Sequence, residues 1–159
     1  MNSAVCSSAS SRVEESSRAS FKTAAGLFSD PRAQLARSWL DRAERDLRLA
    51  RLAVGDPTLS GLATFHCQQA AEKALKAFLA WQPLPRTHDL PVLLARCAAL
   101  EPSFAALQLN AGTLDVYLTV GRYPDSGRDP TPAEAQQTLA LAEQFVAFVS
   151  ARLPQIGPP

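Results

Sequence analysis

The sequence lacks the features that would place it in several broad classes of protein. No apolar run reaches the ~18 to 20 residues that a membrane helix needs, so we expect a soluble, cytoplasmic protein. The net charge of +1 excludes general electrostatic attraction to nucleic acid and leaves only local charged patches. The three cysteines and two histidines lack the spacing of metal ligands. We therefore expect reduced thiols, no metal site and no cofactor.

The length and composition of the chain are sufficient for one domain preceded by a polar segment. A chain of 159 residues that is 47% hydrophobic can bury one core of domain size. Residues 1–29 are rich in Ser, Ala and Arg and poor in large apolar residues, which predicts a disordered tail. A targeting segment is the alternative, although Glu14 and Glu15 interrupt its basic character. We expect the folded domain over residues 30–153 and a short tail over 154–159.

Signals for the ends of helices recur along the folded part. Asp30 and Pro31 are suited to the cap and first position of a helix that extends to about residue 54. Further helices are predicted over about 62–81, 87–100, 104–118 and 132–153, and no strand pattern competes with them. The sequence therefore predicts an all-α fold, a single up-and-down bundle of about five helices. We expect the first two helices and the last to be long antiparallel rods.

Residues 65–79 carry the most informative pattern. The stretch has no Gly or Pro and is predicted to be helical. With about 100° between successive residues, His66, Gln69, Lys73 and Lys76 share one polar stripe. The opposite side consists of small or apolar residues: Ala63, Cys67, Ala70, Ala71, Ala74, Phe78 and Trp81. Residues three and four apart are neighbours on a helix, so the polar stripe can converge on one ligand or one neighbouring helix.

Two other polar residues have two interpretations each. Asp46 lies at the edge of the apolar stripe of the first helix, where an unpaired carboxylate would be costly. It either forms an ion pair that locks the first helix to the second or lines a groove with His66 and Lys73. His88 precedes a short helix that Thr87 or Asp89 can cap. It either bonds to that helix end or belongs to a site.

The last predicted helix has more apolar width than one packing contact requires. Leu141, Phe145 and Phe148 lie beside its main apolar stripe. A homodimer interface is one explanation, and burial beneath the N-terminal segment is the other. From the first explanation we predict a symmetric homodimer through this surface, which Phe145→Asp would dissociate without unfolding the chain.

The helical motif resembles that of a known family. Residues 65–77 read Phe-His-x-Gln-Gln-Ala-Ala-Glu-Lys-Ala-Leu-Lys-Ala, and residues 87–90 and 122–124 add Thr-His-Asp-Leu and Arg-Tyr-Pro. These three pieces are similar, in this order, to the HEPN domain, the nucleotide-binding domain of higher eukaryotes and prokaryotes. The resemblance covers about residues 31–153. It implies a helical domain associated with nucleotides and, in bacteria, frequent pairing with a nucleotidyltransferase-fold protein.

Many HEPN relatives, including toxin-like ones, are metal-independent ribonucleases that use an Arg-x4–6-His motif. Such a histidine would move a proton while the arginine stabilises charge on the phosphate. Arg122 is the natural start of that motif here, but positions 127, 128 and 129 hold Gly, Arg and Asp. We therefore expect no catalytic residues and keep the ribonuclease as an alternative.

The sequence favours a binding module over an enzyme. We expect a polar groove that binds a nucleotide or RNA, with donors for a phosphate and an aromatic ring for a base. Its residues are Asp46, His66, Gln69, Lys73, His88, Arg122 and Tyr123. A structural adaptor, in which the polar stripe is only a packing seam, is the third possibility.

Overall fold

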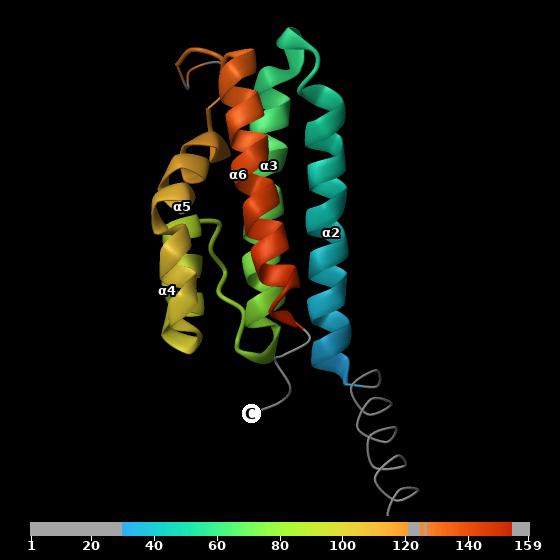
Figure 1. Cartoon of the computed structure of the whole chain (residues 1–159), viewed down its shortest axis with the longest axis vertical. Coiled ribbons are helices and arrows are strands. Elements are labelled where there is room, and N and C mark those ends of the chain that lie inside the picture. Colours follow the sequence, from blue (N-terminus) through green and yellow to red (C-terminus); the bar gives the residue numbers. More distant parts are fainter. Residues whose placement is uncertain (1–29, 121–124, 126, 154–159) are drawn as a thin grey trace, which may run out of the picture.

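The protein is described by a computed structural model over residues 30–120, 125 and 127–153. Within these residues the chain forms five α-helices and no strands (Figure 1). The α-helices are α2 (Pro31–Ala53), α3 (Ser60–Phe78), α4 (Leu90–Leu100), α5 (Gln108–Asp115) and α6 (Pro132–Ser150), and the 3-10 helices are η1 (Pro57–Leu59), η2 (Leu79–Trp81), η3 (Pro102–Leu107) and η4 (Val116–Leu118). The predicted all-α bundle is confirmed. The predicted tails, 1–29 and 154–159, lie outside the described residues.

Local capping explains why several helices begin where the sequence predicts. The Asp30 carboxylate accepts a hydrogen bond from the Arg32 amide at 2.9 Å, and Pro31 occupies the first turn of α2. Asp89 caps α4 in the same way, with its carboxylate 2.8 Å from the Val92 amide. The predicted fourth helix differs, because it is divided into η3, α5 and η4. Short 3-10 turns are common at the ends of α-helices, and here they flank α5 on both sides.

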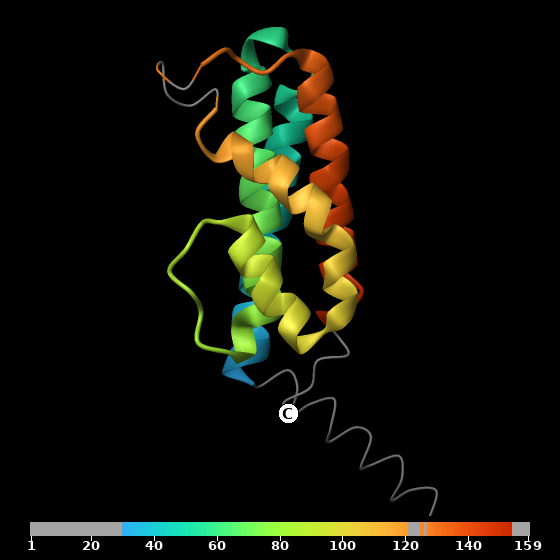
Figure 2. The same ribbon diagram turned by 90° about the vertical axis from the view of Figure 1, so that its left-hand side faces the viewer.

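The helix α3 lies at the centre of the bundle and contacts α2, α4, α5 and α6. Ala53, Ala63 and Ala135 meet at one end of the bundle, where α2 ends and both α3 and α6 begin. At the other end of the bundle a second buried cluster forms, with Leu153 packed against it: Ala33, Ala36, Ala80 and Trp81. Thus α2 is antiparallel to α3 and α6, whereas α6 runs in the same direction as α3 (Figures 1 and 2). The connection between η2 and α4 returns along the bundle, so α4 also follows the direction of α3 (Figure 2).

The predicted packing face of α3 is confirmed, but its polar side is less exposed than expected. All seven small or apolar residues of that face are buried. Gln68 and Glu72 are buried as well, with 0% and 3% of their surface exposed. Lys76, predicted on the outer polar stripe, is 8% exposed and lies 5.5 Å from the ring centre of Trp39. The polar side of α3 is therefore an internal seam over much of its length.

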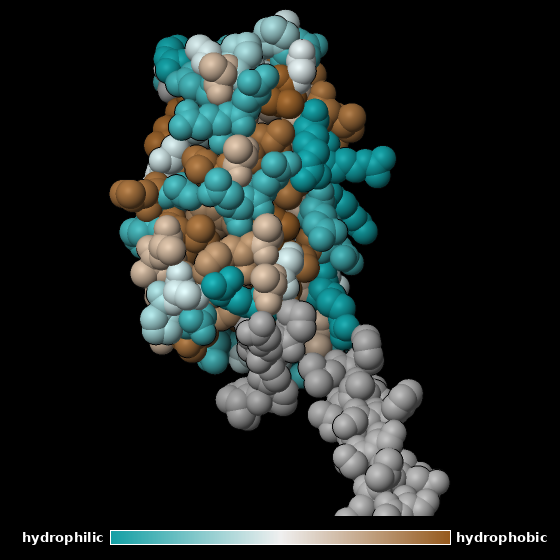
Figure 3. All heavy atoms as spheres, viewed as in Figure 1, coloured by the Kyte–Doolittle hydropathy of each residue, from teal (hydrophilic) through white to brown (hydrophobic). Residues whose placement is uncertain are grey.

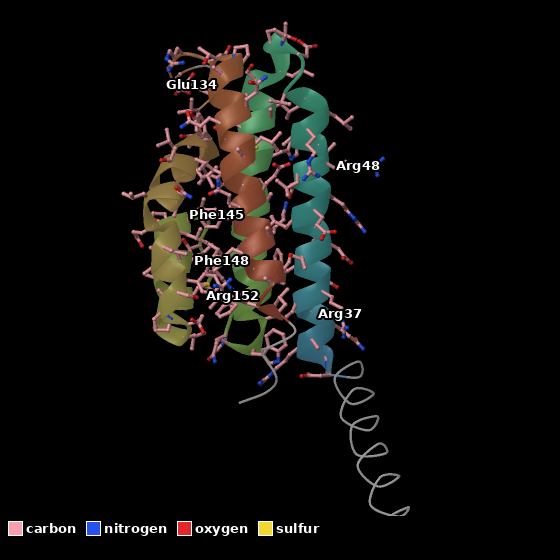
Figure 4. The ribbon with its side chains drawn as sticks, viewed as in Figure 1. Arg37, Arg48, Glu134, Phe145, Phe148 and Arg152 are labelled. Atoms are coloured by element: carbon pink, nitrogen blue, oxygen red, sulfur yellow. The ribbon has the colours of Figure 1, made fainter. Side chains whose placement is uncertain are left out.

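The prediction that Phe145 lies on an exposed dimer surface of α6 is wrong, whereas Leu141 and Phe148 are partly buried and the homodimer itself stays a prediction. Phe145 is fully buried in the main core. Phe148 packs edge to face on Phe104 of η3 at 5.0 Å between ring centres, and the Arg152 guanidinium lies 3.3 Å from its centroid. Figure 4 places Phe145, Phe148 and Arg152 between α6 and the side occupied by α4 and α5. The extra apolar width of α6 serves this intramolecular contact, so Phe145→Asp would damage the fold.

The two described cysteines are buried free thiols. Burial raises the pKa of the Cys67 and Cys97 thiols to about 12, and Glu143 adds to the effect at Cys67. Because the thiolate is the reactive form, both are chemically inert at neutral pH. None of the described helices has the length and apolar character needed to cross a membrane.

Candidate functional site

One half of the polar side of α3 is built around Asp46 of α2. Asp46 is 7% exposed and its two carboxylate oxygens bond to different partners on α3. His66 Nδ1 donates to one oxygen at 2.9 Å, and Lys73 Nζ donates to the other. Burial alone would raise the pKa of Asp46, but the bonds from His66 and Lys73 outweigh it and hold the pKa below its usual value. The carboxylate therefore stays ionised and links α2 to two turns of α3.

The other half is built around Glu72 of α3, which the sequence analysis did not select. Lys76 Nζ donates to Glu72 Oε1 at 2.8 Å. His88 Nδ1 donates to the same oxygen at 3.0 Å, reaching it from the connection that precedes α4. The Gln69 amide also donates to Glu72, at 3.2 Å. The i,i+4 spacing of Glu72 and Lys76 was the only sequence signal for this pairing.

A buried glutamine joins the connection before α4 to this network. The Gln68 amide nitrogen donates to the backbone carbonyl of His88 at 3.1 Å, and its oxygen accepts from the Gln69 amide at 2.8 Å. Gln68 is fully buried, so these two bonds satisfy polar atoms that water cannot reach. The backbone at His88 is thereby fixed against α3, with its imidazole held over Glu72.

We call the six ionisable side chains of this network the polar seam: Asp46, His66, Glu72, Lys73, Lys76 and His88. Side-chain exposure increases from 4% at Glu72 to 18% at His66, 21% at Lys73 and 67% at His88. Two carboxylates face two ammonium groups, so the seam is neutral with uncharged imidazoles and has a charge of +2 with both protonated. The acids are internal, whereas the histidines and Lys73 reach the surface. An anion approaching from solvent thus meets donors first.

The structure brings together five of the seven predicted site residues. Asp46, His66 and Lys73 form one direct cluster, while Gln69 and His88 meet at Glu72. The predicted ion pair between the first two helices is present. Arg122 and Tyr123 lie outside the described residues. Over the described ranges, no group of three or more His, Cys, Asp or Glu side chains is arranged to hold a metal ion.

Comparison with known proteins agrees with this helical architecture. The model of the HEPN domain family matches residues 36–152. The crystal structure of TT1696 from Thermus thermophilus is similar with 35% identity and a TM-score of 0.62, covering 74% of this chain and 97% of that chain. The crystal structure of ST0689, an archaeal HEPN homologue, is similar with 31% identity and a TM-score of 0.58, covering the same shares. No curated protein matches the chain. Since the family model spans most of the sequence and both structures are matched over nearly their whole length, the chain belongs to the HEPN domain family.

Proposed function

We propose that this chain is a nucleotide-associated HEPN module that binds the phosphate of a nucleotide or RNA at the exposed edge of the polar seam. In this proposal it works with a nucleotidyltransferase-type partner, as the family resemblance suggests. The ligand would contact His66, Lys73 and His88, and Arg122 and Tyr123 remain predicted contributors. The chain itself would supply binding and no catalytic group.

The observation that carries the proposal is the position of Lys73 at the surface of an internally paired network. A lysine ammonium has three N–H donors, and Asp46 takes one of them. The His66 ring uses Nδ1 for the same carboxylate, which leaves Nε2 for another partner. Phosphate oxygens accept strong charge-assisted hydrogen bonds from such donors. Because Asp46 fixes both side chains, a phosphate would bind without the entropic cost of ordering them.

Calorimetric titration with ATP and with a single-stranded RNA oligonucleotide tests this proposal. Lys73→Ala should weaken binding of the true ligand by on the order of 1.5 to 3 kcal/mol, because one charge-assisted contact is lost. Arg96→Ala is the matched control, because Arg96 is an exposed cation on α4. Its removal should leave the affinity for the ligand unchanged. Absence of binding in the wild type, or equal affinity in Lys73→Ala, would contradict the proposal.

A second candidate is a structural adaptor, and the pairing within the seam favours it. Asp46 accepts from two side chains and Glu72 from three, so the network is largely satisfied without a ligand. In that case Lys73→Ala lowers the melting temperature while no nucleotide binds the wild type. A nucleotidyltransferase that co-purifies with the chain but requires no nucleotide for the complex would also favour the adaptor.

A further inference from the structure

A row of exposed side chains runs along one side of α2 at spacings of three and four residues. We call it the α2 stripe: Leu35, Ser38, Arg42, Arg45, Leu49 and Leu52. Its three leucines are 40%, 47% and 73% exposed. Residues at this spacing share one side of a helix, as in the contact of a coiled coil. The α2 stripe therefore has the form of a helix-packing face whose partner is not among the described segments.

The α2 stripe differs from the rest of the outer surface of α2. The edge of α2 seen in Figure 3 is covered with hydrophilic side chains, and Arg48 projects from it (Figure 4). Leu49 follows Arg48 in the chain and thus lies about 100° further around the helix. Exposed apolar side chains that gather on one face mark an interaction surface. The α2 stripe is therefore the side of α2 that is suited to bind another segment.

The middle of the α2 stripe is positively charged. Arg45 forms no ion pair with a described residue, and Arg42 lies 5.8 Å from the ring centre of Trp39. A second copy of the stripe fits poorly here, because a two-fold axis at the midpoint of the stripe would place Arg42 opposite Arg45 of the copy. A nucleic acid is disfavoured because the stripe offers no aromatic ring on which a base can stack. The α2 stripe fits a segment with small or apolar side chains and a carboxylate.

The segment that precedes α2 has a matching sequence. Four of its residues recur at spacings of three and four: Glu14, Ser17, Phe21 and Ala24. These residues would share one side of a helix. Glu14 and Glu15 are the only acidic residues among residues 1–29. Gly26 follows the spaced residues and can end a helix, which leaves a connection over residues 26–30 of the length usual between antiparallel helices.

We propose that residues 14–25 bind the α2 stripe as a helix antiparallel to α2. Four facing pairs then share one midpoint, which lies between Ser29 and Asp30. The pairs, with the residue of the α2 stripe second, are Ala24 with Leu35, Phe21 with Ser38, Ser17 with Arg42, and Glu14 with Arg45. Each pair joins a smaller side chain to a larger one, as interdigitating helices require. The last pair also joins opposite charges.

The position of this segment in the chain supports the proposal. Because α2 begins at Pro31, directly after the segment, docking within one chain closes only a short loop and costs little entropy. A helix of this length is marginal in water by itself. The composition that predicts a disordered tail is thus compatible with a helix that forms only on α2. The proposal does not depend on the proposed nucleotide site, and it leaves the aromatic face of α6 to Phe104 of η3.

Hydrogen exchange of the full chain, measured by mass spectrometry, tests the docking. The amides of residues 18–25 should exchange at least tenfold more slowly than in a free peptide of the same sequence. Arg42→Glu/Arg45→Glu should remove this protection, because like charges then face Glu14 and Glu15. Adding Glu14→Arg/Glu15→Arg to that variant should restore the protection.

Controls separate this outcome from damage to the bundle. Arg48→Glu reverses an exposed charge on another side of α2 and should leave the protection unchanged. The substituted residues of α2 are exposed, so all variants should keep the slow exchange of α3 and the melting temperature of the wild type. A wild type without protection of residues 18–25 would overturn the proposal. So would protection that survives the reversal of Arg42 and Arg45.

An engineered disulfide tests the register. In a chain that also carries Cys6→Ser, Ala24→Cys/Leu35→Cys should form a disulfide within one molecule. Ala24→Cys/Leu49→Cys is the matched control and should not, because Leu49 lies about 21 Å further along α2 than Leu35. The two described cysteines are buried and should not compete. Equal yields from the two variants, or a disulfide that joins two chains on a non-reducing gel, would contradict the proposal.

Discussion

His66 on α3 and Asp46 on α2 are twenty residues apart in the sequence, and His66 Nδ1 lies 2.9 Å from a carboxylate oxygen of Asp46. Lys73 bonds to the other oxygen of the same carboxylate. The pairing sets which turns of the two helices face each other. It also fixes the side chains on which the proposed anion site depends.

Asp46→Asn should destabilise the protein by about 1–3 kcal/mol at neutral pH. The amide keeps the size of the side chain but leaves Lys73 without its counter-charge. Solvent screening is limited because the Asp46, His66 and Lys73 side chains are each at most 21% exposed. Urea unfolding followed by circular dichroism measures the change. Asp129→Asn, at an exposed carboxylate, is the control and should leave the free energy of unfolding nearly unchanged.

The contribution of Asp46 to stability should disappear in acid. Its pKa in the folded protein is lowered, whereas an unfolded Asp titrates at about 3.9. The stabilisation is therefore present above that unfolded pKa and is lost as the pH falls through the folded pKa. The difference in unfolding free energy between the wild type and Asp46→Asn should be larger at pH 6 than below about pH 3. A difference that stays constant over that range would show that the ionised carboxylate is not responsible.

Phe145→Asp should prevent stable folding, in contrast to the dissociation expected from sequence alone. Phe145 is fully buried, and a carboxylate at its position would lose the ring contacts and lack a partner. The cost of about 3–5 kcal/mol or more is a large share of the usual stability of a domain. Leu109→Asp is the matched control, because Leu109 is 86% exposed and should tolerate the change. Thermal melting distinguishes the two, and a cooperative transition near that of the wild type in Phe145→Asp would contradict the structure.

The sequence was most informative where local chemistry decides the structure. Asp30 and Asp89 cap their helices through carboxylates two or three residues from the amides that they accept, so their roles are visible in short segments. The buried face of α3 follows from its spacing of small and apolar residues. These features need no knowledge of how distant segments pack.

The sequence-based predictions of exposure are wrong where a segment that is distant in the sequence covers a residue. Glu72 is buried because the connection before α4 folds back over α3 and brings His88 to it. Phe145 is buried in the main core, and Phe148 is partly buried because η3 supplies Phe104 on that side of α6. A helical wheel gives the direction of each side chain but not which other segment lies there. The number of helices was therefore predictable, whereas the exposed part of each was not.

The chain should not cleave single-stranded RNA. The ribonuclease motif of HEPN relatives would need a histidine at position 127, 128 or 129, and Arg128 stands at the middle of these. Its guanidinium forms two bonds to Glu134, at 2.8 and 2.5 Å, and Glu134 raises the Arg128 pKa above its already high value. A group that stays protonated cannot accept the proton of a 2′-hydroxyl, so Arg128 cannot replace the histidine.

Purified protein incubated with a fluorescent RNA oligonucleotide, with and without chelator, should give no products. Cleavage that disappears in Arg122→Ala would show that the chain is a ribonuclease after all, whereas cleavage that persists in this variant would identify a contaminating enzyme.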